Sequence, residues 1–208
     1  TAWCIAVILG MLIAAGRGSR SRVFALLGLG YVLVFRNIPF LVQLFFWYFA
    51  APLLLPERTQ VWVYDHVQNF PYWCGVVGLG IYTASRVAEQ FRSGLQSIPV
   101  DQYRAAYATG LRPAQVYRHV ILPYAFRIII PPFTTEFLTC FKNSALTMTI
   151  GVMEITHTAY YIDSFTWHGL ETTTAASISY LTIAQLIALI MWRVEKKMHV
   201  PGMIARRS

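Results

Sequence analysis

The chain has 208 residues, of which 56% are hydrophobic and 12% charged, and its formal net charge is +8. Soluble domains carry about 25% charged residues, so this composition excludes an ordinary soluble protein and indicates an integral membrane protein. A nucleic-acid-binding protein is excluded as well, because its basic residues would spread over a polar surface, whereas here they gather beside apolar segments.

The first apolar segment, residues 2–15, would rise about 21 Å as a helix, less than the hydrocarbon core of a bilayer at roughly 30 Å. We therefore expect the first membrane span to begin before Thr1, so that the N-terminus is truncated. A signal peptide is the alternative, but no basic region precedes the segment. Residues 16–22 form a turn with three arginines, which the positive-inside rule places in the cytoplasm. The chain is thus expected to start outside.

The second apolar segment, residues 23–55, is too long for one straight crossing. It is interrupted by Arg36, Asn37 and Pro39, and proline disfavours helical geometry at the residue before it. The sequence therefore predicts a short helix, a break at FRNIP, and a second span over residues 39–55. Such breaks often line a cavity in transporters, although this one would equally mark the cytoplasmic start of a span.

Three further spans are predicted over residues 72–98, 124–148 and 172–192. The connections at residues 56–70 and 154–171 hold one Arg and no Lys or Arg, respectively, so both are expected on the external side. The basic residues after the last span are Arg193, Lys196, Lys197, Arg206 and Arg207. They predict a cytoplasmic C-terminus.

The expected fold is all-α and polytopic, with five visible transmembrane helices in a single domain, residues 1–208. The charge bias agrees with this topology at every connection. The third span is rich in glycine in its outer half, at Gly75, Gly78 and Gly80. Small residues there permit close helix packing, although flexibility explains them equally well.

The connection at residues 99–123 is a long polar interval with several basic residues against one acid, Asp101. Asp101 is expected to cap a short helix, Gly110 to end it, and Pro113 to begin a second one. Two short helices at right angles on the membrane face would form a knob that a partner could grip. An interfacial amphipathic hairpin without a partner is the alternative.

Six residues of this connection recur at the same spacing in a known motif: Ala105, Ala106, Gly110, Ile121, Leu122 and Pro123. They resemble the EAA loop of permease subunits from bacterial ATP-driven (ABC) importers. The resemblance extends through FRNIPFLVQ, AEQFRSGLQSIP and KNSAL. The whole chain is similar to the polar amino-acid subfamily, in particular to glutamate/aspartate permeases.

The resemblance implies a MetI-like permease fold in the lipid of the bacterial inner membrane. It implies that residues 99–123 form a cytoplasmic coupling loop that docks on a separate ATP-binding cassette subunit. It also implies a second permease subunit, either a copy or a homologue, and a periplasmic amino-acid-binding protein that delivers substrate. ATP and magnesium would bind the partner ATPase, so this chain is expected to be neither an enzyme nor a cofactor-binding protein. In agreement, the sequence contains no G-x-x-x-x-G-K-[ST] phosphate loop.

The resemblance assigns ATPase coupling to five residues: Arg104, Ala105, Ala106, Gly110 and Leu111. Arg104 stands where the family has a glutamate, which reverses the charge at the knob. A contact to the ATPase at this position therefore needs a different partner from the one that the family uses.

Charged residues within spans cost about 2.5–3.5 kcal/mol each on insertion scales, so each needs a partner or a function. Arg86, Glu89 and Arg92 recur every three residues in the third span. They form either a self-neutralising ladder near the cytoplasmic end or a part of the substrate pathway. Our hypothesis is that Arg86 recognises the carboxylate of an acidic side chain, because its guanidinium is a fixed bidentate donor.

Lys142, Ser144 and Glu154 complete the predicted substrate pathway, since an amino acid needs one anionic and one cationic partner for its zwitterionic end. The alternative is that Lys142 pairs with Glu136 or Glu89 and holds helices together. No metal site is expected, because the five histidines are scattered and lack the spacing of metal ligands.

The expected function is the pore subunit of an ATP-driven importer of polar amino acids, in particular glutamate and aspartate. One alternative is a permease for another polar amino acid such as glutamine. A second is an ion-coupled secondary transporter, which predicts an inverted repeat and transport insensitive to vanadate. A membrane enzyme is disfavoured because the sequence offers no nucleophile–base pair or paired catalytic carboxylates.

Overall fold

The computed structural model describes residues 1–19 and 21–198, and within them the chain is helical and contains no strand. The long helices are α1 (Ala2–Arg17), α2 (Arg22–Asn37), α5 (Phe70–Gln96), α8 (Leu122–Asn143) and α10 (Gly169–Met198). The shorter α-helices are α3 (Phe40–Phe45), α4 (Glu57–His66), α6 (Val100–Ala108), α7 (Pro113–Val116) and α9 (Ile155–Thr166). These helices confirm the all-α prediction.

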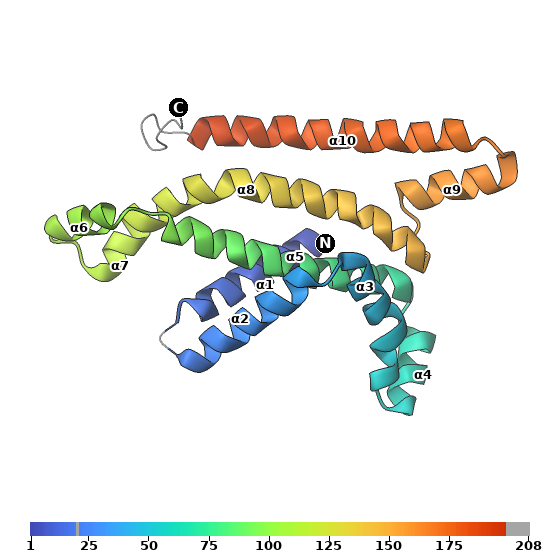
Figure 1. Ribbon diagram of the computed structural model, residues 1–208, viewed down its shortest axis with the longest axis horizontal. Helices are drawn as coiled ribbons and strands as arrows, with labels where there is room; N and C mark the ends of the chain where they lie inside the picture. Colours follow the sequence, from blue (N-terminus) through green and yellow to red (C-terminus); the bar gives the residue numbers. More distant parts are fainter. Residues whose placement is uncertain (20, 199–208) are drawn as a thin grey trace.

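The long helices lie side by side in one order. In Figure 1, α10 runs along α8, α8 runs along α5, and the α1–α2 hairpin packs on the other side of α5. Close approach of α1 and α5 depends on glycine, because a Cβ at Gly80 would lie 2.9 Å from Ile5 Cγ2 and a Cβ at Gly10 would lie 2.5 Å from Val87 Cγ1. The packing role predicted for the glycines of this span is therefore confirmed at Gly80.

The predicted break at FRNIP is confirmed. Helix α2 ends at Asn37, and the helical segment Phe40–Ala50 that follows is bent by 105° relative to it. Pro39 supplies no N–H to continue the helix, and the buried Gln43 side chain donates to the carbonyls of Phe35 and Ile38 at 2.8 Å each. Gln43 thus satisfies backbone groups that the break leaves open, which stabilises the bend.

Two segments predicted as external loops are largely helical. Residues 56–70 contain α4, which follows Pro56 and has Glu57 in its first turn, a favourable position for a carboxylate. Residues 154–171 contain α9, which begins directly after Glu154. The scarcity of Lys and Arg in these two segments predicts the side of the membrane on which they lie, but it gives no information on whether they are helical.

The predicted fourth span also ends differently. Helix α8 stops at Asn143, and a 3₁₀ helix, Ser144–Ile150, continues to Gly151. The predicted fifth span is contained in α10, which begins three residues earlier than expected and runs six residues further.

Within residues 1–19 and 21–198, α10 is the one helix long and apolar enough to cross a membrane by itself. Helix α2 and the segment Phe40–Ala50 pass the same test together as a bent pair. Helix α1 is apolar but has only 16 residues, while α5 and α8 have the length but carry charged side chains. The number of five crossings therefore stays a prediction.

The connections sort to two ends of the molecule. The end of α1, the start of α2, the α6–α7 connection and the last turns of α10 lie at one end, whereas α4 and α9 lie at the other (Figure 1). The first group holds the basic segments that were predicted to be cytoplasmic. Arg20, Arg206 and Arg207 lie outside the described residues.

Candidate functional site

The predicted coupling loop forms a helical hairpin. Its first arm, α6, ends where Gly110 adopts a left-handed backbone conformation with φ +78°, so the predicted stop at this glycine is confirmed. The second arm, α7, continues without a turn through a π-helical segment, Tyr117–Ile121, into α8. Displacement of the hairpin would therefore act directly on a long helix.

The two adjacent alanines of the loop face opposite ways. Ala106 is buried against Val116 and Ile121, which are fully buried, whereas Ala105 is exposed. A small residue at 106 lets α6 pack closely against the second arm. A small residue at 105 leaves a flat outer surface.

Asp101 does not cap the first arm as predicted. Pro99 occupies the N-cap position, because proline fixes the extended geometry from which α6 starts, and Asp101 lies in the first turn. Its carboxylate lies 3.4 Å from Arg104, with both side chains more than three-quarters exposed. Such an exposed pair contributes little to stability, so Arg104 is available on the surface of the knob.

The aromatic side chains inside the hairpin connect its two arms. The rings of Tyr103 in α6 and Tyr117 in the second arm meet edge to face at 6.2 Å. Burial, with smaller contributions from Tyr117 and Tyr107, raises the pKa of the Tyr103 phenol. Tyr103 is therefore neutral at pH 7 and behaves as part of the packed hairpin.

Arg86 forms an ion pair across two long helices. Its Nε donates to Glu136 Oε2 of α8 at 2.7 Å, and its guanidinium carbon lies 5.9 Å from the centre of the Tyr82 ring. The Glu136 side chain is 6% exposed and that of Arg86 is 33% exposed. The sequence analysis considered Glu136 as an alternative partner of Lys142, whereas in the structure Glu136 pairs with Arg86. This ion pair joins α5 to α8.

The predicted ladder is confirmed between Glu89 and Arg92, which pair one helical turn apart in α5. Arg92 also donates to Gln96 at 2.7 Å. Sequence reasoning missed a third member, Arg17 of α1, which donates to Glu89 at 2.6 Å. Glu89 therefore ties the end of α1 to the end of α5 near the coupling loop.

Lys142 does not pair with either predicted acid. Among the residues that the structure describes, Glu136 and Glu89 pair with arginines, and Lys142 is exposed without an ion pair. Glu136 lies where α8 meets α5 and Glu89 lies where α5 meets α1, while the Lys142 side chain lies on the surface. The neighbouring Ser144 donates to the carbonyl of Phe141 at 2.7 Å.

Glu154 caps the start of α9. Its carboxylate accepts from the backbone N–H groups of His157 at 2.7 Å and Thr156 at 2.9 Å, and from the hydroxyl of Tyr180 in α10 at 2.5 Å. These bonds explain why a helix begins here. They also connect α9 to α10, a role that the sequence did not indicate.

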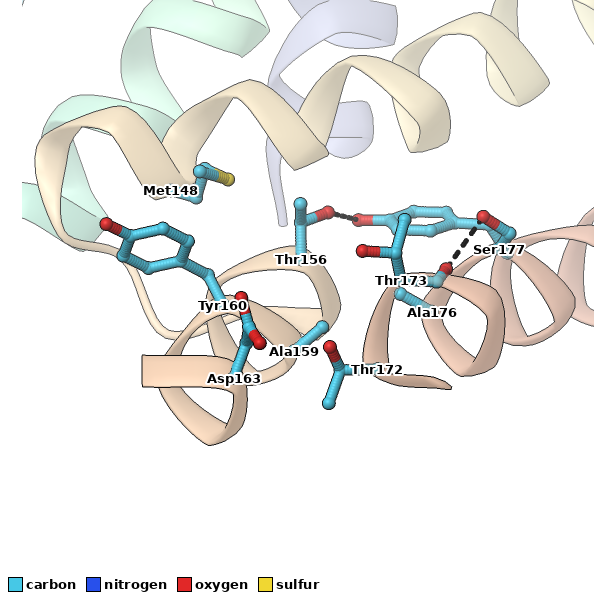
Figure 2. Close-up of a pocket in the computed structure, with 10 residues that line it drawn as sticks. Met148, Thr156, Ala159, Tyr160, Asp163, Thr172, Thr173, Ala176 and Ser177 are labelled. Carbon is cyan, nitrogen blue, oxygen red and sulfur yellow. Dashed lines mark hydrogen bonds between the residues drawn. The ribbon is translucent and has the colours of Figure 1, made fainter. Parts of the chain in front are cut away.

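A cavity of about 240 Å³ lies beside this cap, between α9 and α10. Figure 2 shows Thr156, Tyr160 and Asp163 of α9 opposite Thr172, Thr173 and Ser177 of α10, with Met148 at one side. The lining surface is mainly apolar, with several hydroxyl groups and the carboxylate of Asp163 at its polar points. It does not include Arg86, Ser144 or Glu154, so this cavity does not unite the predicted pathway residues.

Replacing Glu154 by alanine is expected to lower the free energy of unfolding by about 1–2 kcal/mol, because the helix cap and the acceptor for Tyr180 are both lost. Thermal unfolding of the purified protein in detergent measures the effect. Asp65→Ala is the control, since this exposed acid lies in the last turn of α4, away from the cap. Equal stability of the two variants would contradict the capping role.

Within residues 1–19 and 21–198, no group of three His, Cys, Asp or Glu side chains could hold a metal ion. Charges that pair between long apolar helices are typical of an integral membrane protein.

Comparison with known proteins narrows this class. The family model of the binding-protein-dependent transport system inner membrane component matches residues 6–200, and the chain belongs to this family. The chain is 39% identical to the glutamate/aspartate import permease protein GltJ of Escherichia coli K12 over 97% of its own length and 82% of that protein. It is 30% identical to the arginine transport system permease protein ArtQ of Bacillus subtilis, over 93% and 84% of the two chains.

Solved structures agree. An amino acid ABC transporter crystallised with histidines contains a chain that superposes with a TM-score of 0.81 at 28% identity, over 94% of this chain and 86% of that one. The MetNI methionine ABC transporter matches with a TM-score of 0.68 at 20% identity, over 96% and 88%, which shows the shared fold. The chain is therefore a polytopic, inner-membrane permease subunit of an ABC importer for amino acids.

Proposed function

We propose that this permease subunit forms half of the pore of an importer for acidic amino acids, with glutamate and aspartate as substrates. The observation that carries the substrate class is the 39% identity to a glutamate/aspartate import permease over nearly the whole chain. Arg86 supports the same substrate class. Its side chain is one-third exposed beside Glu136, and its guanidinium is a suitable donor for a substrate carboxylate.

The energy source is proposed to be a separate ATP-binding subunit that grips the hairpin of residues 99–123. Support comes from the exposed surface of α6, which carries Arg104 and Ala105, and from the continuous helical path from α7 into α8. Leu111 lies half-buried beside Gly110, at the turn between the arms. ATP and magnesium would bind that partner, and this chain would receive the motion.

The orientation is proposed to place the hairpin and the basic segments in the cytoplasm, with α4 and α9 outside. The clustering of these segments at opposite ends of the molecule supports it (Figure 1). A periplasmic amino-acid-binding protein would then meet the outer end. A second permease subunit and membrane lipid would cover the long apolar face of α10, on which Leu186 and Leu189 are more than half exposed.

The substrate pathway is proposed to include Arg86, Glu89, Lys142, Ser144 and Glu154. Their surroundings suggest different parts in it. Arg86 and the exposed Lys142 are able to meet an anionic group, whereas Glu89 and Glu154 hold helices in position through the bonds described above.

Uptake by vesicles tests this function. The complete transporter, reconstituted with its ATPase and binding protein, is expected to accumulate radiolabelled glutamate when ATP is enclosed, and aspartate should compete more strongly than glutamine. Vanadate should stop the uptake. Uptake that needs an ion gradient and ignores vanadate would instead identify a secondary transporter, and uptake of glutamine in preference to glutamate would reassign the substrate.

A further inference from the structure

Arg36 is an exposed cation at the end of α2. It lies in the last turn of α2, just before the 105° break. Among the residues that the structure describes, no side chain or carbonyl forms an ion pair or hydrogen bond with it. In contrast, Arg17, Arg86 and Arg92 each pair with Glu89 or Glu136.

The break lies level with the middle of α5, a predicted membrane span. The ring of Phe40, immediately after the break, packs 5.3 Å from the ring of Tyr82. Tyr82 is twelve residues from the start of α5 and fourteen from its end, or about 18 Å and 21 Å along the helix. Arg36 is four residues from Phe40, so its charge is held near mid-depth rather than at a lipid headgroup.

An arginine at a helix C-terminus ordinarily bonds the last carbonyls of its own helix. In α2, other groups donate hydrogen bonds to these carbonyls. The Asn37 side chain donates to the carbonyl of Leu33 and the Ile38 N–H to that of Val34. The Gln43 side chain donates to the carbonyl of Phe35. In the part of the chain that the structure describes, the guanidinium of Arg36 bonds none of these carbonyls. The local structure keeps this cation available.

The helices that pack around the break offer no free anion among the described residues. Helices α1, α2, α3, α5 and α8 contain two acids, Glu89 and Glu136, and both pair with arginines. The acids of α10, Glu171 and Glu195, belong to a helix that packs on α8 and α9, and Glu195 accepts from Thr134. In a second copy of this chain the same two acids would be engaged in the same way. Since a cation at mid-depth costs about 2.5–3.5 kcal/mol without compensation, an external anion is required.

We propose that Arg36 binds a carboxylate group of the amino acid while it crosses the pore. The inference rests on the proposed function as a transport pore. The planar guanidinium can hold a carboxylate through two parallel hydrogen bonds, and it does so best where water is scarce. Because every amino acid carries an α-carboxylate, Arg36 can act whether or not the transported side chain is acidic.

Transport provides the first test. Arg36→Gln is expected to lower the initial rate of ATP-driven glutamate uptake by about a hundredfold, and Arg36→Lys by about tenfold, because lysine keeps the charge without the bidentate geometry. Arg22→Gln is the matched control, since Arg22 is an exposed arginine at the other end of the same helix. Co-purification with the ATPase and basal ATP hydrolysis should be unchanged in all three variants. Uptake by Arg36→Gln within threefold of the wild-type rate would overturn the proposal.

Thiol labelling provides a test that does not depend on turnover. Leu33 lies one turn before Arg36 and is 54% exposed, so Leu33→Cys reports on the same face of α2 while Arg36 stays intact. The exposed Cys4 is first replaced by serine, whereas Cys74 and Cys140 are buried. A membrane-impermeant maleimide should label the introduced thiol, and millimolar substrate should slow the labelling at least threefold.

The protection should vanish when Arg36→Gln is added to the Leu33→Cys protein. A thiol that is not labelled would show that this face meets lipid or another subunit, and protection that persists without Arg36 would show that the substrate is held by other groups. Either result overturns the proposal. If the proposed function is wrong, wild-type vesicles supplied with ATP accumulate no amino acid, which distinguishes this failure from failure of the Arg36 proposal. If the wild type takes up a neutral amino acid, that amino acid is used as the substrate in the protection assay.

Discussion

Gly110→Val is expected to separate the permease from its ATPase and to reduce ATP-driven uptake at least tenfold. Gly110 has φ +78°, a backbone region in which a β-branched residue is strained by about 1–3 kcal/mol. A Cβ at this position would meet no atom within 4 Å, so the effect comes from the backbone alone. The turn between α6 and α7 would adopt another geometry and present the knob in the wrong orientation. Recovery of the ATPase with affinity-tagged permease, together with vesicle uptake, measures the effect.

Two controls isolate the turn. Gly110→Asn should keep most of the binding, because asparagine tolerates the left-handed region. Gly151→Val places the same strain, at φ +83° and also in open space, after the 3₁₀ helix at the end of the molecule opposite the hairpin. It should lose some stability but retain the ATPase. Full ATPase recovery with Gly110→Val would show that docking does not depend on this hairpin.

Glu136→Gln is expected to give the largest loss of stability, about 3 kcal/mol. The substitution leaves the Arg86 charge in the bundle without its carboxylate, and breaking a buried pair from one side costs about 3–5 kcal/mol. The value should fall at the lower end because Arg86 is one-third exposed. The thermal midpoint in detergent should fall by roughly 5–10 °C.

Further variants distinguish lost charge from lost function. In the double variant Arg86→Met with Glu136→Leu, no unpaired charge remains, so the thermal midpoint should return to within a few degrees of wild type. Uptake should stay low, because the proposed donor for the substrate is gone. Asp101→Asn, at the exposed pair with Arg104, should change stability by less than about 0.5 kcal/mol. A midpoint for Glu136→Gln equal to that of Asp101→Asn would contradict the role of the Arg86 pair.

Local features were predictable from the sequence where the chemistry of one residue dominates. Pro39 ends α2 because it lacks an N–H, and Gly110 ends α6 because it accepts a left-handed conformation. The pairing of Glu89 with Arg92 follows from their spacing on one helix. Asp101 was wrongly predicted as a cap, since Pro99 two residues earlier already sets the start of the helix.

The candidate site was less predictable because its bonds join distant segments. Arg86 and Glu136 are 50 residues apart, and Arg17 and Glu89 are 72 apart. Periodicity shows which face of a helix is polar but not which helix packs against it. For the same reason the sequence could not decide whether Lys142 pairs with Glu136 or Glu89, a pairing that the structure does not contain, and it did not predict the contact of Glu154 with Tyr180.

The sequence by itself determined the membrane class, the all-α fold, the break before Pro39, the position of the hairpin at residues 99–123 and the resemblance to ABC importer permeases. These depend on composition, local backbone chemistry and short motifs. Only the tertiary structure decided which charges neutralise one another, and therefore that Arg36 has no anionic partner within residues 1–19 and 21–198. The physical reason is that ion-pair partners are selected by the packing of α1, α5 and α8, which depends on close contacts such as that of Gly10 with Val87.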